Sequence, residues 1–167
     1  MIRMLAFAAA TLFAAAAPAQ DETPATVLQD FDGRPRSLQE FTGQGKWTVV
    51  MIWAHDCHVC NEEVESYEDF HRRHQGTDAT VLGISMDGQE RKKQARAFIR
   101  RHRLTFPNLI GEPEAVAGLF TELTGVQWVG TPTFLIYSPA GQLVAQQIGA
   151  VPVQMVEEFI REQSAGG

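Results

Sequence analysis

Cysteine is scarce in this chain of 167 residues, which contains only Cys57 and Cys60. Without a second cysteine pair, the chain lacks the four-ligand pattern of a structural zinc site. Haem attachment through C-x-x-C-H is also excluded, because Asn61 follows Cys60. A disulfide that encloses so few residues restricts little of the unfolded chain and adds little stability. The scarcity of cysteine therefore favours a chemical role for this pair over a structural one.

Positive charge is also in deficit, since 14 Lys and Arg residues oppose 20 Asp and Glu residues, for a formal net charge of −6. Nucleic-acid binding requires clustered cations against the phosphates, so we expect no nucleic-acid partner. Half of the basic residues nevertheless lie within residues 91–103. A solvated helix face and a docking patch for an acidic partner both fit this segment.

The chain has one long apolar run, residues 4–17, which is short for a membrane-spanning helix of about 20 residues. Arg3 precedes the run, and residues 17–19 form an A-x-A cleavage site. We therefore predict a bacterial signal peptide over residues 1–19 and a single exported, periplasmic domain over residues 20–167. An uncleaved N-terminal membrane anchor is the alternative.

The spacing of apolar residues predicts an α/β fold. Residues 47–53 and 79–86 are apolar and rich in β-branched side chains, as in strands buried on both faces. Strands separated by helices imply parallel pairing, and a turn at residues 138–141 predicts a terminal hairpin. We expect a three-layer sandwich around a central mixed β-sheet. The other predicted elements are strands at 25–31, 133–137 and 142–148, and helices near 38–41, 57–76, 88–103, 114–123 and 153–162.

The dithiol is predicted to lie where the strand over residues 47–53 gives way to a long helix. Backbone N–H groups and the helix dipole stabilise a thiolate at such a position. Cys57 is then the nucleophile that attacks a substrate disulfide, and Cys60, one helical turn further on, resolves the mixed disulfide. A small metal site made by both sulfurs with His55 and His58 is a competing interpretation.

Helical spacing also places an acidic residue beside Cys60. On a wheel of about 100° per residue, Glu63 falls in the apolar arc between Tyr67 and Phe70. Partial desolvation should raise the pKa of the Glu63 carboxyl toward neutrality, so that it can take the proton from Cys60. A carboxylate at the rim that reaches water is the alternative interpretation.

The two neighbours of Cys57 carry charges of opposite sign. Asp56 is predicted to be the N-cap of the helix, and its charge would disfavour the Cys57 thiolate and favour a more reducing couple. A protonated His58 would act in the opposite direction. An Asp56 that caps the helix with little redox effect is equally consistent with the sequence.

Three features together resemble the thioredoxin superfamily: the W-A-x-x-C-x-x-C run at residues 53–60, the segment G-T-P-T at residues 130–133, and the order of the elements. More narrowly, residues 25–163 are similar to the exported thiol-disulfide oxidoreductases of the TlpA, ResA and CcmG type. The segment at residues 31–41, the C-x-x-C-x-x-E motif and a helical insert at residues 113–123 carry this narrower resemblance.

This resemblance implies a thioredoxin-like fold with an N-terminal extension, and an enzyme that needs no cofactor or metal. Pro132 would be a cis-proline that faces the dithiol, and Thr131 would offer its backbone to a substrate chain. Trp53 would pack beside the dithiol, and we assign it to substrate binding together with Thr131 and His58. The chain departs from the family at Asp56, where most relatives have tryptophan.

We therefore expect an extracytoplasmic reductase of specific protein disulfides, for example in cytochrome c maturation. It would act as a monomer on protein thiols and disulfides and draw on a membrane or periplasmic electron donor. Peroxide-reducing relatives usually have Pro and Thr where this chain has Val50 and Ala54, which weakens that interpretation. An oxidase or isomerase of the same fold, and a copper-binding protein or metallochaperone that uses both thiols, are the alternatives.

Overall fold

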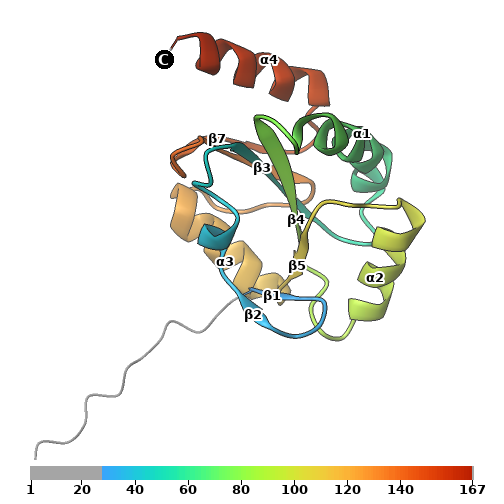
Figure 1. The fold of residues 1–167 in the computed structure, drawn as a ribbon. Coiled ribbons are helices and arrows are strands. Elements are labelled where there is room, and N and C mark those ends of the chain that lie inside the picture. Colours follow the sequence, from blue (N-terminus) through green and yellow to red (C-terminus); the bar gives the residue numbers. More distant parts are fainter. Residues whose placement is uncertain (1–27, 167) are drawn as a thin grey trace, which may run out of the picture.

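Seven strands form one mixed sheet with helices on both faces (Figure 1). The computed structural model describes residues 28–166, so the predicted signal peptide and cleavage site lie outside the described residues. The strands are β1 (Leu28–Asp30), β2 (Pro35–Arg36), β3 (Trp47–Trp53), β4 (Ala79–Ser85), β5 (Asn108–Ile110), β6 (Thr133–Tyr137) and β7 (Leu143–Ile148). The helices are the 3-10 turn η1 (Leu38–Glu40), α1 (His58–His74), α2 (Lys92–Arg101), α3 (Pro113–Thr124) and α4 (Val153–Ala165).

The sheet has the strand order β2-β1-β5-β4-β3-β6-β7. Strand β3 lies between β4 and β6, parallel to β4 and antiparallel to β6. Strand β5 is parallel to β4, and β6 forms the predicted hairpin with β7. The mixed sheet predicted from the alternation of strands and helices is therefore confirmed.

Alternate side chains of β3 enter two separate cores, which explains why its sequence is almost entirely apolar. Val49 and Met51 join the cluster that α1, α2 and α4 cover. Val50 and Ile52 point to the other face and join the cluster beneath α3 and η1. All seven residues of the strand are buried, so the predicted three-layer sandwich is confirmed.

Two strands and several helix boundaries differ from the sequence prediction. The largest boundary difference is in α2, which begins at Lys92, whereas the sequence predicts a start near residue 88. The sheet includes β2 and β5, whereas the sequence around Asn108 predicts only a break after the basic helix. These strands are short, and Pro107 precedes β5, so no apolar repeat marks either of them.

Among residues 28–166, no helix combines the length and apolarity that crossing a membrane requires.

A buried carboxylate on α1 holds the segment between α2 and β5. Glu68 Oε2 accepts the Thr105 backbone N–H at 2.7 Å, and Glu68 Oε1 accepts the Thr105 hydroxyl at 2.6 Å. Arg72 Nε donates to the same Oε1 at 2.7 Å. Burial alone would raise the pKa of Glu68, but the hydrogen bonds from Thr105 and Arg72 outweigh it and hold that pKa below its usual value.

We expect Glu68→Gln to lower the free energy of unfolding by about 1–3 kcal/mol, the usual effect of leaving a buried donor without an acceptor. Because the folded-state pKa is depressed, the carboxylate stabilises the fold at neutral pH and loses that effect as the pH falls through its pKa. Denaturant unfolding should therefore show that the difference in the free energy of unfolding between Glu68→Gln and the parent becomes smaller in acid. Asp69→Asn, at the exposed neighbouring position, is the control, and a difference independent of pH would contradict the prediction.

Candidate active site

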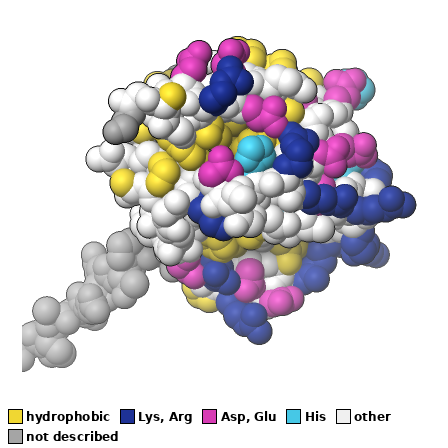
Figure 2. Space-filling view, turned by 45° about the horizontal axis from the view of Figure 1, so that its top comes forward, with side chains coloured by type: hydrophobic (Ala, Val, Ile, Leu, Met, Phe, Trp, Pro, Cys, Tyr) yellow, Lys and Arg dark blue, Asp and Glu magenta, His cyan; other side chains and the backbone are white. Residues whose placement is uncertain are grey.

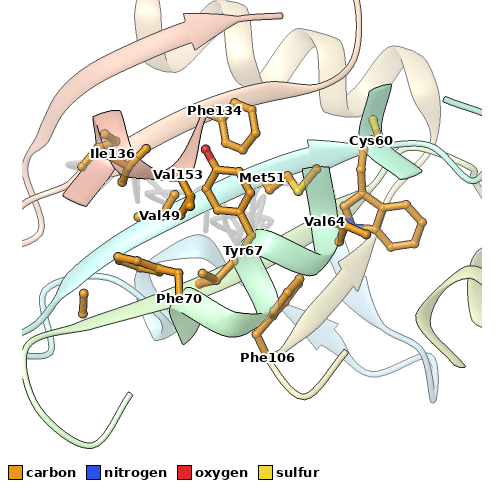
Figure 3. Close-up of a cluster of buried hydrophobic side chains, with 14 of the residues drawn as sticks. Val49, Met51, Cys60, Val64, Tyr67, Phe70, Phe106, Phe134, Ile136 and Val153 are labelled. Atoms are coloured by element: carbon orange, nitrogen blue, oxygen red, sulfur yellow. The ribbon is translucent and has the colours of Figure 1, made fainter. Parts of the chain in front are cut away.

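Cys57 and Cys60 form a disulfide at the start of α1, with their Cα atoms 5.3 Å apart. Cys57 is partly exposed, whereas Cys60 is fully buried in the core cluster beneath the helix. Figure 3 shows Cys60 on the same side of α1 as Val64 and Tyr67, which pack against the sheet. The exposed sulfur is the one that a substrate can reach, and this supports Cys57 as the nucleophile.

The helix begins one residue later than predicted, and Asp56 is not its N-cap. Cys57 is the N-cap, and its Sγ accepts the backbone N–H of Cys60 at 3.1 Å. A free N–H of the first helical turn therefore points at the sulfur, as the thiolate hypothesis requires. Asp56 is exposed in the preceding turn, where its carboxylate lies 3.9 Å from Arg91. The prediction that Asp56 caps the helix is wrong, because the sulfur takes that place.

Glu63 lies one turn after Cys60, partly buried, as the helical wheel predicts. Its Oε2 is buried without a hydrogen-bond partner in residues 28–166. Desolvation raises the pKa of Glu63, and the nearby Glu62 charge adds to the rise, against the lowering effect of the Val151 N–H. The neighbouring Tyr67 hydroxyl donates to the Val151 carbonyl at 2.8 Å.

Trp53 ends β3 and has no exposed surface. Its ring stacks on Phe98 at a centroid distance of 4.3 Å, and its Nε1 donates to Asn108 Oδ1 at 3.1 Å. Trp53 belongs to the same buried cluster as Cys60, in line with its predicted packing near the dithiol. The predicted direct contact between Trp53 and a substrate does not fit this burial, because the ring presents no surface to a docked chain.

The remaining predicted substrate residues occupy separate elements. The bond between Thr131 and Pro132 is cis, which confirms the predicted cis-proline. That Pro132 faces the dithiol and that Thr131 binds a substrate chain both remain predictions. His58 is exposed over 86% of its side chain, and its Nε2 lies 3.1 Å from Glu62.

A histidine–aspartate pair involves the turn that precedes the dithiol, and no motif in the sequence marks it. His55 Nδ1 is 2.6 Å from Asp87 Oδ1, in the turn that leads to Cys57. Asp87 follows β4, the parallel neighbour of β3, so the carboxyl ends of two adjacent strands bring the pair together. That adjacency is the signal that could have identified the pair, because polar residues after neighbouring parallel strands meet at one edge of a sheet.

Helix α2 brings basic side chains to one side of the dithiol. Figure 2 shows Lys and Arg side chains gathered along the side of the molecule where Figure 1 places α2. Arg101 donates to Asn61 Oδ1 at 2.6 Å, and Asn61 Nδ2 donates to the carbonyl of Cys57 at 2.8 Å. The basic segment is thus connected to the backbone of the active-site turn.

Comparison with known proteins identifies relatives of this chain. The AhpC/TSA family matches residues 19–146. A thiol-disulfide oxidoreductase ResA from Halalkalibacterium halodurans is 25% identical over 134 residues, which cover 80% of this chain and 70% of the relative.

Solved structures support the same fold. A thiol:disulfide interchange protein from Chlorobium tepidum has a TM-score of 0.65 at 18% identity, over 80% of this chain and 88% of its own. The pneumococcal exposed lipoprotein thioredoxin of Streptococcus pneumoniae has a TM-score of 0.61 at 21% identity, over 81% of this chain and 96% of its own. Because the family match spans most of the chain and the C-x-x-C pair forms a disulfide at a helix N-terminus, the chain belongs to the AhpC/TSA family as a thioredoxin-like thiol-disulfide oxidoreductase.

Proposed function

We propose that this enzyme works outside the cytoplasm as a reductase of specific protein disulfides, for example in cytochrome c maturation. Cys57 attacks the substrate disulfide, Cys60 resolves the mixed disulfide, and Glu63 accepts the Cys60 proton. Thr131 and Pro132 form the platform for the substrate chain, and the exposed His58 contributes to its binding. The observation that carries this proposal is the Glu63 carboxylate, which has a buried oxygen without a partner in residues 28–166 and lies one turn from a fully buried thiol.

Charge near the sulfurs supports the reducing direction. A couple becomes more oxidising when its surroundings stabilise the thiolate. Here Asp56 precedes Cys57 and Glu63 follows Cys60, so carboxylates flank both sulfurs along the chain. The cation that would favour an oxidase, a protonated His58, is largely exposed and already paired with Glu62. The disulfide form is therefore favoured over the dithiol, as a donor of electrons requires.

The reduction potential of the Cys57–Cys60 couple tests this direction. Equilibration with glutathione should give a value near that of thioredoxin, about −270 mV. A value near about −120 mV would instead identify an oxidase. Tight, stoichiometric binding of Cu(I) by the reduced protein would favour the copper-binding alternative and count against the reductase.

The role of Glu63 is tested by Glu63→Gln. We expect the mixed disulfide to be resolved about 10²-fold more slowly at neutral pH, the lower end of the usual range for general acid–base catalysis. Stopped-flow measurement on a mixed disulfide with a thiol-containing peptide gives this rate. Glu65→Gln, at an exposed position of the same helix, should leave it unchanged.

The same variant should not destabilise the fold. Because the folded-state pKa of Glu63 is raised, ionised Glu63 opposes folding at high pH, and this cost disappears as the pH falls below its unfolded-state pKa. Thermal unfolding of Glu63→Gln should therefore match or exceed the parent at neutral pH and match it in acid. An unchanged resolution rate, or a large loss of stability, would refute the assignment.

The extracytoplasmic location is supported by two independent observations. Residues 1–19 have the charge, apolar run and A-x-A site of a signal peptide. One structural neighbour is named an exposed lipoprotein thioredoxin. Val50 and Ala54 stand where peroxide-reducing relatives usually carry Pro and Thr, which supports disulfide over peroxide as the substrate.

A further inference from the structure

We propose that His55, held by Asp87, is the proton-transfer group of Cys57, as Glu63 is that of Cys60. The two sulfurs would then each have their own acid–base group, on opposite sides of the disulfide along the chain. This inference rests on the disulfide exchange proposed above. It adds a role for two residues, 32 positions apart, that the C-x-x-C-x-x-E motif does not include.

Hydrogen bonds fix the His55 ring and its tautomer. Asp87 Oδ2 accepts the His55 backbone N–H at 3.0 Å and the Ser85 hydroxyl at 2.7 Å. Asp87 Oδ1 lies 2.6 Å from His55 Nδ1. The Asp87 side chain is only 1% exposed, and a buried carboxylate surrounded by donors makes Nδ1 the donor as well. The other ring nitrogen, Nε2, is then the atom that accepts and releases a proton.

The backbone holds His55 close to Cys57. The Cys57 N–H donates to the Ala54 carbonyl at 3.2 Å, so residues 54–57 form a closed turn with His55 inside it. The Asn61 amide donates to the carbonyls of both Cys57 and His55, at 2.8 Å and 3.4 Å. Asn61 is itself fixed by Arg101. The histidine side chain is 23% exposed and Cys57 is partly exposed, so both residues of the turn reach solvent.

The site combines a nucleophile, Cys57, with a histidine, His55, and a carboxylate, Asp87, that orients the histidine. Other enzymes use this arrangement to activate a nucleophile. There, a base lies beside the nucleophile and a third group orients the base. The charged groups around His55 are Asp87 on the sheet edge, Asp56 in the turn, and Arg91, which lies 3.9 Å from Asp56. Asp87 hydrogen-bonds the ring directly, so it is the carboxylate that acts most strongly on His55.

A metal site is the competing interpretation of this cluster, since ligand atoms of His55, Asp56 and Asp87 lie within 4.8 Å of one another. The hydrogen bonds argue against it. Both Asp87 oxygens already accept hydrogen bonds from His55 or Ser85. Asp56 is exposed and lies near a cation. The pair is therefore arranged for proton transfer.

The proposed step balances protons and electrons. In the reduced enzyme, the Cys57 thiol gives its proton to His55 Nε2, and the thiolate attacks one sulfur of the substrate disulfide. A Cys57–substrate disulfide forms, the substrate S–S bond breaks, and its electron pair leaves on the second sulfur, which takes the proton from Nε2. Cys60 then gives its proton to Glu63 and attacks the Cys57 sulfur. The Cys57–Cys60 disulfide forms, the Cys57–substrate bond breaks, and the released substrate sulfur takes the proton from Glu63. The substrate gains two electrons and two protons.

His55→Asn separates proton transfer from structure. An asparagine amide N–H occupies nearly the position of Nδ1, so Asp87 keeps a partner, but Nε2 is lost. We expect the pH at which half of Cys57 is thiolate to rise. With Cys60→Ala in the background, formation of the mixed disulfide should slow by roughly 10-fold or more at neutral pH, because proton transfer in the attack is lost. Alkylation of Cys57 by iodoacetamide across pH measures the thiolate fraction.

His74→Asn is the matched control, since His74 lies at the far end of α1 and its Nδ1 is 2.9 Å from Asp78. It should change the rate by less than about twofold, as expected for an exposed ion pair. Asp87→Asn should shift the alkylation profile in the same direction as His55→Asn. If Asp87→Asn fails to fold, His55→Asn alone decides the question.

Three results would overturn the proposal. One is an alkylation profile of His55→Asn that superimposes on that of the parent. A second is a change in thermal stability with the pH profile intact, because a purely structural clamp would behave in that way. The third is a parent profile that changes on adding EDTA, because a bound metal would then set the thiolate fraction in place of the free imidazole. Alkylation requires no protein substrate, so this experiment remains decisive even if the enzyme proves not to reduce protein disulfides.

Discussion

Replacing Cys57 with serine is expected to reduce disulfide exchange to the uncatalysed rate, whereas Cys60→Ala should trap a mixed disulfide with the substrate. The difference follows from the exposure of the two sulfurs, since Cys57 is partly exposed and Cys60 is fully buried. A serine hydroxyl cannot replace a thiolate as the attacking group. Without Cys60, the first attack still occurs, but the product cannot be resolved.

The measurement is the accumulation of adducts under non-reducing conditions. Cys60→Ala, incubated with a disulfide-containing peptide, should give one stoichiometric adduct by mass spectrometry, and Cys57→Ala should give none. Neither variant should lose much stability, because the disulfide encloses only two residues and constrains the unfolded chain little. Trapping by Cys57→Ala in place of Cys60→Ala would reverse the assigned roles of the two sulfurs.

The parts of this site that could be predicted from sequence depend on local periodicity. Trp53 ends a continuous apolar run that only a strand buried on both faces would carry. Glu63 follows Cys60 at a helical spacing, so its partial burial could be derived from a wheel. The cis bond before Pro132 is different, because it was inferred from a family resemblance and the sequence pattern alone did not require it.

The parts that could not be predicted depend on contacts between distant segments or on competition for one position. His55 and Asp87 meet only because β3 and β4 are parallel neighbours. Strand β5 is three residues long and takes its place from pairing with β4 and β1. Asp56 has the preferred N-cap chemistry, yet the Cys57 sulfur accepts the N–H that an N-cap side chain would take.

Gly83, within β4, leaves room for the hydrogen bond that fixes the Trp53 ring. A Cβ atom at this position would lie 2.0 Å from Asn108 Oδ1 and 2.9 Å from Trp53 Nε1. These two atoms form the 3.1 Å hydrogen bond that holds the tryptophan ring, and the Asn108 amide also donates to the Phe106 carbonyl at 2.9 Å. Any side chain larger than hydrogen must therefore displace Asn108 and leave the buried indole N–H without its acceptor.

We expect Gly83→Ala to lower the free energy of unfolding by about 3 kcal/mol, since overpacking costs about 1–3 kcal/mol and an orphaned buried donor a similar amount. For a chain of this size, that corresponds to a fall in Tm of roughly 6–12 °C. Thermal unfolding by circular dichroism measures it. Gly118→Ala, on an exposed face of α3 where a Cβ meets nothing within 4 Å, should raise stability by about 0.5–1 kcal/mol.

A double variant identifies the cause of the loss. If the Cβ acts through Asn108, then Asn108→Ala removes the clash, and Gly83→Ala should cost far less in that background than in the parent. The coupling between the two changes should be about 1–3 kcal/mol. Additive effects would show that Gly83 is needed for another reason, such as the backbone conformation of β4. Strong coupling would instead mean that a glycine and an asparagine on neighbouring strands together hold the tryptophan that packs in the same core cluster as Cys60.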